Sequence, residues 1–251
     1  MDVTGGAFSR GMILCAGEGR RLRPLTASLA KPLIEIQGKS CLVRALDHMS
    51  RFGIECCVVN ARHLAQQVSA CVDAYGASCP SMSLHVSVEE ESLESGGGVK
   101  KALPLLGDKP FFVVNGDIVW REEGDSHVFQ RLVERWDGKR MDIAMMVLPT
   151  PVPMHEELVG DFDMEESWRG WGRLFRGSKP FSYVFSGIQL LSPHLFAETQ
   201  GLVSFSLRRL YDEAWRKGRL YGVTYGGVWY HLSSLDHVRA SAQWTGLSRA
   251  P

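Results

Sequence analysis

Short apolar runs alternate with amphipathic stretches through the first 150 residues of the chain. Runs rich in Val, Ile, Leu or Phe predict buried β-strands at 12–16, 55–60, 82–88, 110–115 and 142–148. Between them, apolar residues recur at helical spacing from Leu64 to Val72, and again from Val128 to Trp136 with Ser126 as the N-cap. This alternation predicts an α/β fold with a doubly wound, mostly parallel sheet flanked by helices.

The alternation stops after Pro149. Residues 150–180 carry prolines, glycines, charges, Trp168 and Trp171 without a clear period, which predicts an irregular insertion able to form a wall over a pocket. Regular patterns then return as a strand at 181–191, a helix at 206–217, a strand-like run at 220–231 and a last helix after Ser233.

Composition narrows the class of protein. A length of 251 residues suits one α/β domain, and 28 Lys plus Arg balance 28 Asp plus Glu, which argues against nucleic acid or an anionic membrane as the main partner. The longest apolar stretch falls short of the roughly 18 residues of a membrane span. Residues 1–11 lack the apolar core of a signal peptide and are expected to form a flexible leader. Six cysteines without Cys-x-x-Cys spacing are expected to be reduced thiols of a cytoplasmic protein.

The segment directly after the first predicted strand carries the most specific chemistry. Gly17-Glu18-Gly19 can approach a ligand closely and present backbone N–H groups as an anion nest. Around it, four basic residues against Glu18 give a local charge of +3: Arg20, Arg21, Arg23 and Lys31. In a doubly wound sheet this loop lies beyond the carboxyl ends of the strands, where ligands bind. The segment therefore predicts a polyphosphate site.

The common phosphate motifs do not fit this loop. Leu22 stands where a dinucleotide fingerprint needs its third glycine, and the chain has no Gly-Lys-Ser/Thr triplet. Pro24 argues against a helix that begins directly after the glycines. Instead, Gly17 to Thr26 together with Lys31-Pro32 resembles the signature loop of the sugar-1-phosphate nucleotidyltransferases, also called NDP-sugar pyrophosphorylases. Their pattern is Gly-x-Gly-x-Arg-Leu/Met-x-Pro-Leu-Thr, followed after a gap by Lys-Pro.

This resemblance implies a Rossmann-like fold and a reaction in which an NTP and a sugar 1-phosphate give an NDP-sugar and pyrophosphate. It implies one domain over 12–251, with a nucleotide-binding half at 12–148 and a sugar-binding half at 149–245. Arg21 is expected to neutralise the β- and γ-phosphates, and Lys31 to stabilise charge on the α-phosphoryl group. The nucleotide-binding residues implied in this region are Leu14, Ala16, Gly17, Glu18, Gly19, Arg20, Arg21 and Lys31.

A strongly apolar run ends in Asn115-Gly116-Asp117. By itself this is a common turn sequence, but beside the first motif it resembles the family's metal-binding aspartate motif. The resemblance implies that Asn115 and Gly116 contact the nucleotide, and that Asp117 is catalytic and binds Mg²⁺.

The family's second metal aspartate lies in a Trp-x-Asp-x-Gly-Thr segment, and here that position holds His231. Because imidazole suits Mn²⁺ or Zn²⁺ better than Mg²⁺, Mn²⁺ becomes an alternative cofactor. His231 could bind the metal, bind a metal-bound water or a phosphate oxygen, or be a spectator in a weakened site. Asp236 is a substitute ligand or, in Ser233-x-x-Asp236, part of a helix cap.

The segment from Leu93 to Gly98 leads into a predicted helix at 99–103, and Gly97 is expected to contact the base. Its sequence resembles the N-acetylmuramate-1-phosphate uridylyltransferase branch of the family. Gly160 and Gly187 are the expected sugar contacts by the same resemblance.

The first choice of substrates is therefore UTP and N-acetylmuramate 1-phosphate. Guanylyl transfer to mannose 1-phosphate or a heptose 1-phosphate remains an alternative, as does a catalytically weak sugar-nucleotide-binding regulatory protein. A glycosyltransferase is disfavoured because Asn115-Gly116-Asp117, rather than an Asp-x-Asp motif, stands at the end of the predicted strand at 110–115. The oligomeric state stays open.

Overall fold

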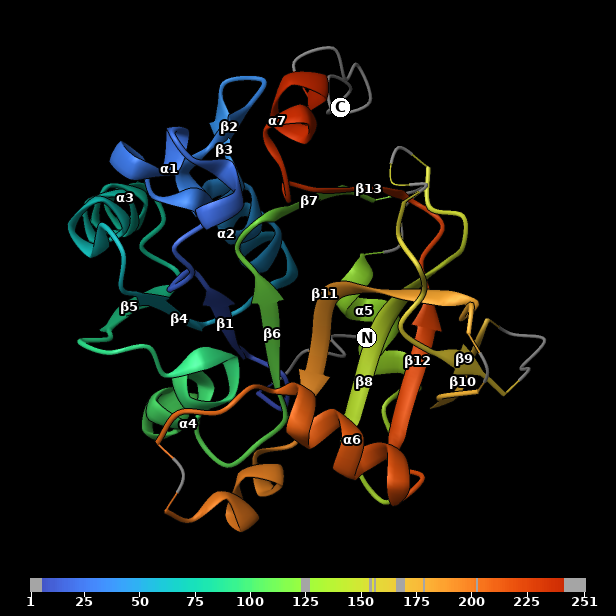
Figure 1. Cartoon of the computed structure of the whole chain (residues 1–251). Helices are drawn as coiled ribbons and strands as arrows, with labels where there is room; N and C mark the ends of the chain where they lie inside the picture. Colours follow the sequence, from blue (N-terminus) through green and yellow to red (C-terminus); the bar gives the residue numbers. More distant parts are fainter. Residues whose placement is uncertain are drawn as a thin grey trace.

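The computed structural model describes residues 6–122, 127–153, 155, 157–165, 170–177, 179–201 and 203–241 (Figure 1). Its centre is a nine-stranded sheet. In spatial order the strands are β5 (Ser83–Val88), β4 (Cys56–Ala61), β1 (Arg10–Leu14), β6 (Phe111–Asn115), β11 (Tyr183–Leu191), β8 (Ile143–Pro149), β12 (Leu220–Thr224), β10 (Trp171–Phe175) and β9 (Asp163–Met164).

Most strands of this sheet share one direction. β5, β4, β1 and β6 are mutually parallel, and β12 is parallel to β8. β11 is antiparallel to both β6 and β8, so these two neighbours point the same way. Only β11 and β10 run against the rest of the sheet. The predicted α/β class with a mostly parallel sheet is confirmed.

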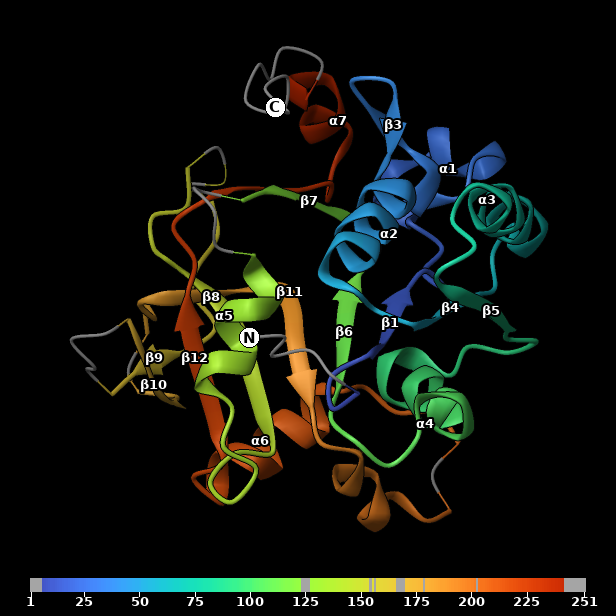
Figure 2. The same ribbon diagram turned by 180° about the vertical axis from the view of Figure 1, so that it is seen from behind.

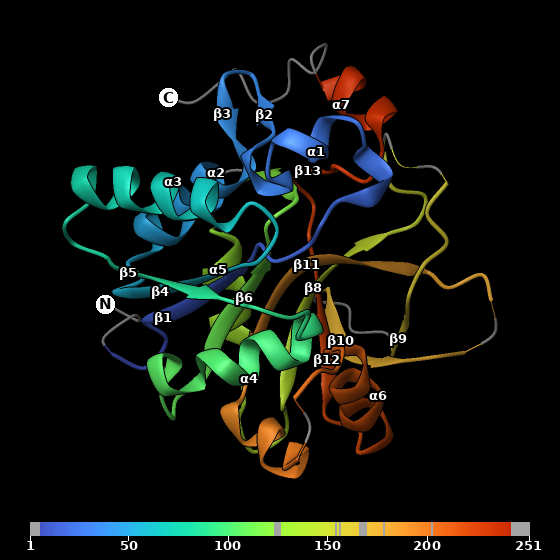
Figure 3. The same ribbon diagram turned by 60° about the vertical axis from the view of Figure 1, so that its left-hand side comes forward.

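Helices cover both faces of the sheet because its strands are apolar on both sides. In β6, Phe112 and Val114 enter one hydrophobic cluster, whereas Phe111 and Val113 enter the other. The first cluster is covered by α2 (Cys41–Phe52), α3 (Ala65–Ser78) and α5 (Val128–Arg135), which Figure 2 shows from behind. The second is covered by α4 (Glu94–Leu106), the 3-10 helix η3 (Pro193–Thr199) and α6 (Arg208–Arg216). The turned view of Figure 3 separates these two layers.

A smaller layer lies beyond the carboxyl edge of the sheet. It contains the 3-10 helices η1 (Arg20–Leu22) and η2 (Lys31–Leu33), α1 (Leu25–Ser28), the hairpin β2 (Glu35–Ile36) with β3 (Lys39–Ser40), the ribbon β7 (Ile118–Arg121) with β13 (Val228–His231), and α7 (Leu235–Ser241). Leu22, Val119 and Tyr230 belong to a third buried cluster that joins these pieces. Through this cluster, the N-terminal loop packs against the segments that follow β6 and β12.

Several boundaries differ from those expected. β1 begins at Arg10, so two residues of the expected leader are in the sheet, and residues 1–5 lie outside the described residues. The N-cap of α5 is His127, whose side chain accepts the Phe129 N–H; Ser126 lies outside the described residues. The insertion at 150–180 contains β9 and β10 and is therefore partly regular.

All six cysteines are free, and four of them are buried. In the part of the chain that the structure describes, no helix is both long enough and apolar enough to cross a membrane.

Candidate active site

A cleft of about 420 Å³ opens at the carboxyl edge of the sheet. Its floor is a row of strand ends, because Leu14 of β1 is in register with Asn60 of β4 on one side and Asn115 of β6 on the other. Most residues that the sequence assigned to the nucleotide and metal sites line it: Leu14, Ala16, Gly17, Gly19, Arg20, Arg21, Lys31, Asn115, Gly116 and Asp117. The structure thus gathers two motifs separated by about 90 residues of chain into one cavity.

Two glycines allow the loop and the strand end to approach each other. Gly19 has φ 63°, and a Cβ there would lie 3.0 Å from the Thr26 side chain and 3.2 Å from Lys31 Cβ. A Cβ on Gly116 would lie 2.7 Å from both Cys15 Sγ and the Leu14 carbonyl oxygen. Gly116 N–H donates to that carbonyl at 3.0 Å. This close packing brings Asp117 beside the N-terminal loop.

Part of the positive charge of the loop is neutralised internally. The Glu18 carboxylate accepts hydrogen bonds from Arg20 Nε at 2.6 Å and from Arg62 Nη2 at 2.5 Å. These two guanidinium groups lower the pKa of Glu18 to about 2, despite some desolvation. Glu18 does not line the cleft, but it orients Arg20, which does. Arg62 has no place in the sequence motifs and was not predicted.

Lys31 and Asp117 line one part of the cleft, and His231, which does not line it, contacts Asp117. Lys31 Nζ donates to Asp117 Oδ2, and His231 Nε2 lies 3.3 Å from the same oxygen. Burial raises the pKa of Asp117, but the hydrogen bonds and charges of His231 and Lys31 outweigh it, and the pKa lies well below its usual range. Asp117 is therefore an ionised carboxylate held between two nitrogen groups.

The backbone around His231 is firmly placed. His231 N–H donates to Nε2 of the fully buried His155 at 3.1 Å, and Trp229 Nε1 donates to the Ser186 carbonyl at 2.8 Å. Asp236 does not replace the family's aspartate, because it is exposed and pairs with Arg239 at 3.0 Å. The cap of α7 is Ser234, whose Oγ accepts the His237 N–H at 3.2 Å.

The structure adds a buried polar pair that sequence reasoning did not assign to the site. Asn60 Oδ1 accepts the Cys15 N–H at 2.7 Å, and Asn60 Nδ2 donates to Glu89 Oε1 at 2.7 Å. Asn60 and Glu89 are only 2% and 3% exposed, yet both line the cleft. Polar residues at the ends of two neighbouring apolar strands were the signal that could have found them. Further lining residues that were not predicted are Ser92, Glu94, Ser95 and Ser233.

The predicted base and sugar residues are not brought into the cleft. The helix α4 already begins at Glu94, so Gly97 is inside it rather than before it, and its N–H donates to the Phe205 carbonyl at 3.1 Å. A Cβ on Gly97 would lie 2.3 Å from the Val203 carbonyl oxygen, which explains the glycine by packing. Gly160 is also buried, and a Cβ there would collide with the Phe181 backbone. Gly187, with φ 87°, packs under Asn115 and touches the site only through that side chain.

Comparison with known proteins identifies the family to which the chain belongs. The nucleotidyl transferase family model matches residues 10–158, which is more than half of the chain and includes the loop and Asp117. The chain belongs to the nucleotidyl transferase family. A relative named N-acetylmuramate alpha-1-phosphate uridylyltransferase, from Caulobacter vibrioides, is 33% identical to this nucleotidyl transferase over 88% of the chain and 90% of the relative. A protein of the same name from Neisseria meningitidis serogroup B is 27% identical over 94% and 98%.

Solved structures agree on the fold of this nucleotidyl transferase. A UDP-glucose pyrophosphorylase complexed with UDP-glucose superposes with a TM-score of 0.77, over 94% of this chain and 97% of that one, at 14% identity. The likeness covers 94% of this chain and so extends beyond residues 10–158, which the family model matches.

Proposed function

We propose that this nucleotidyl transferase moves a uridylyl group from UTP to N-acetylmuramate 1-phosphate and releases pyrophosphate. Two relatives of nearly equal length that carry this activity in their names support the choice of substrates. The observation that carries the proposal is that Asp117, which lines the cleft together with the Gly17–Gly19 loop, contacts both Lys31 and His231.

The reaction needs positioning and charge neutralisation more than acid–base chemistry. An oxygen of the sugar phosphate attacks the α-phosphorus of UTP, and the bond from that phosphorus to the pyrophosphate oxygen breaks. Lys31 supplies positive charge where negative charge grows on the α-phosphoryl oxygens. Arg21 and the N–H groups of the glycine loop bind the departing pyrophosphate, and Arg20 is oriented for the same purpose by Glu18.

A divalent cation fits between Asp117 and His231. Asp117 Oδ2 and His231 Nε2 are 3.3 Å apart, close to the roughly 3 Å that separates adjacent ligands around an octahedral ion with bonds of about 2.1 Å. One carboxylate and one imidazole leave most ligand positions to phosphate oxygens and water. When bound, such an ion would neutralise the triphosphate and template the two substrates. The imidazole donor favours Mn²⁺ relative to Mg²⁺.

The test is a substrate matrix on purified protein. UTP or GTP is combined with N-acetylmuramate 1-phosphate, mannose 1-phosphate or a heptose 1-phosphate, with Mg²⁺ or Mn²⁺, and pyrophosphate release is followed. The proposal expects the fastest release from UTP with N-acetylmuramate 1-phosphate. Release mainly from a GTP pair would move the protein to the guanylyl branch, and no release from any pair would remove the enzymatic function.

Two variants connect the activity to the site. Asp117→Asn should lower kcat by roughly 100-fold or more, as for loss of one preorganised charge-stabilising group. Asp47→Asn is the matched control, because Asp47 also pairs with a lysine, Lys39 at 2.7 Å, but on the exposed side of α2. Equal activity of the two variants would contradict the assignment of Asp117.

A further inference from the structure

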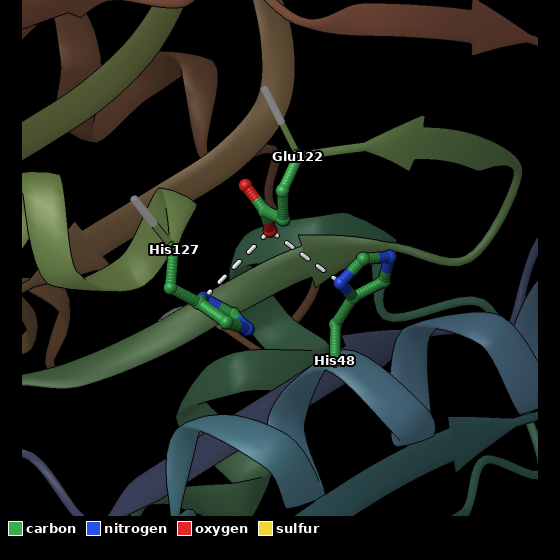
Figure 4. A group of neighbouring side chains, drawn as sticks. All are labelled: His48, Glu122 and His127. Atoms are coloured by element: carbon green, nitrogen blue, oxygen red, sulfur yellow. Dashed lines mark ion pairs between the residues drawn. The ribbon is translucent and has the colours of Figure 1, made fainter. Parts of the chain in front are cut away.

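A second group of metal-ligating side chains lies away from the cleft, where α2, the end of β7 and the start of α5 meet (Figure 4). His48 comes from α2, Glu122 follows β7, and His127 caps α5. Glu122 Oε1 lies 3.4 Å from His48 Nδ1 and 3.7 Å from His127 Nδ1. All three ligand atoms lie within 4.8 Å of one another.

The hydrogen bonds around the cluster fix which atoms face its centre. His48 Nε2 lies 3.2 Å from the Trp120 carbonyl oxygen, so this nitrogen carries the proton and Nδ1 presents a lone pair. Nδ1 is buried with no hydrogen-bond partner among the described residues, and the His48 side chain is only 8% exposed. His127 Nδ1 lies 3.7 Å from the same carboxylate oxygen and accepts the Phe129 N–H at a long 3.3 Å, a bond that a metal on Nδ1 would replace.

Two imidazole nitrogens and one carboxylate oxygen therefore lie close together around one point. A cation at that point would be within reach of all three. Glu122 is itself oriented by Trp120 Nε1 at 3.1 Å and by the Val128 N–H at 3.0 Å.

We propose that His48, Glu122 and His127 form a zinc site. Two histidines, one glutamate and a water are a ligand set that zinc accepts, and bonds of about 2.0–2.1 Å in a tetrahedron separate neighbouring ligands by roughly 3.3 Å. The two distances from Glu122 Oε1 are close to this value. The bond from His48 to the Trp120 carbonyl is the outer-shell contact that orients a zinc-bound imidazole. Glu122 and His127 are 17% and 20% exposed, so water can reach the fourth position.

A zinc ion at this site would be structural and would take no part in the reaction. β7 begins at the residue after Asp117, and the cluster joins the far end of that strand to α2 and α5. Zinc bound there would hold three elements of the nucleotide-binding half together without touching the substrates.

The experiment measures zinc directly in the full chain. Protein stripped with a chelator is dialysed against Zn²⁺ at neutral pH, its zinc content is determined by elemental analysis, and the affinity by calorimetry. Wild type should bind one zinc at this site, and Glu122→Gln should lose at least roughly tenfold in affinity, the loss typical of even an outer-shell partner. Glu157→Gln is the matched control, because Glu157 also lies between two histidines, His155 and His237, but is 57% exposed.

Two more variants separate the remaining explanations. Asp117→Asn should keep this zinc, because it alters only the cleft. His127→Asn removes one ligand but keeps a good N-cap for α5, so it should fold normally, by circular dichroism, and still bind zinc weakly. The proposal is overturned by wild type that binds no zinc, by equal affinity in Glu122→Gln and Glu157→Gln, or by complete loss of zinc in Asp117→Asn.

Discussion

The buried amide of Asn60 offers the sharpest test of how the cleft floor is built. Asn60 satisfies two groups at once, the Cys15 N–H at the start of the glycine loop and the Glu89 carboxylate. Asn60→Leu keeps the branched shape of the side chain, with methyl groups in place of the amide, and removes both bonds. The free energy of unfolding is then expected to fall because both partners stay buried without this amide.

The size of the loss follows from the two partners. An unsatisfied buried N–H costs about 1–3 kcal/mol, and loss of a hydrogen bond to a charged group costs about 1.5–3 kcal/mol. Because both losses occur at one residue they are not fully additive, and we expect about 3–4 kcal/mol in total. For a chain of this size that is a decrease in Tm of roughly 6–16 °C.

Urea unfolding followed by circular dichroism measures this loss. Gln67→Leu is the control, because the Gln67 amide also accepts a backbone N–H, from Ala30 at 2.9 Å, and donates to a backbone carbonyl, but Gln67 is only half-buried and has no carboxylate partner. Its cost should be smaller than that of Asn60→Leu. A loss for Asn60→Leu below 1 kcal/mol, or one equal to the control, would refute this account of the buried pair.

Three further outcomes are expected. Unfolded His127 binds its proton near pH 6.5 and folded His127 only near pH 4, so the unfolded state holds more protons between these values. Stability should therefore fall as the pH drops from about 6.5 to about 4, by at most about 3 kcal/mol, and His127→Asn should reduce that slope. Gly116→Ala should cost about 1–3 kcal/mol, because its Cβ meets a backbone carbonyl at 2.7 Å, whereas Gly17→Ala, which meets nothing within 4 Å, should leave stability within about 0.5 kcal/mol. His231→Asp should raise activity with Mg²⁺ relative to Mn²⁺, measured by pyrophosphate release.

Each of these outcomes has a result that contradicts it. The histidine argument fails if chelator-treated wild type and His127→Asn lose stability with the same slope between pH 6.5 and pH 4. The packing argument fails if Gly116→Ala and Gly17→Ala unfold at the same urea concentration. The metal argument fails if His231→Asp keeps the wild-type ratio of Mg²⁺ to Mn²⁺ activity while Asp117→Asn is inactive.

The centre of the sheet was predictable because its inner strands are buried on both faces. The run 111–114 is apolar at every position, which is typical of a central strand. The Gly17 loop and Asn115-Gly116-Asp117 were also predictable in place, since parallel strands bring their carboxyl ends to one edge.

The glycines of α4 show what a local pattern cannot predict. Gly96, Gly97 and Gly98 read as a flexible cap, but the structure uses them for close packing inside a helix. Gly97 faces the Val203 carbonyl, more than 100 residues away in sequence, and Gly98 faces Glu89. Such contacts depend on which segment the fold lays against the helix. For the same reason the pairing of His48 with Glu122 had no signature in the sequence.

The register of the strand ends has a consequence for motion in the cleft. Leu14, Asn60 and Asn115 are locked side by side by the ladders of β1, β4 and β6, so they cannot shift singly. Their amide protons should exchange with solvent only when the whole domain unfolds, and no faster in the absence of substrates. Any closure around a bound nucleotide must then come from lining segments outside these strands, such as the one that carries Ser92 and Glu94.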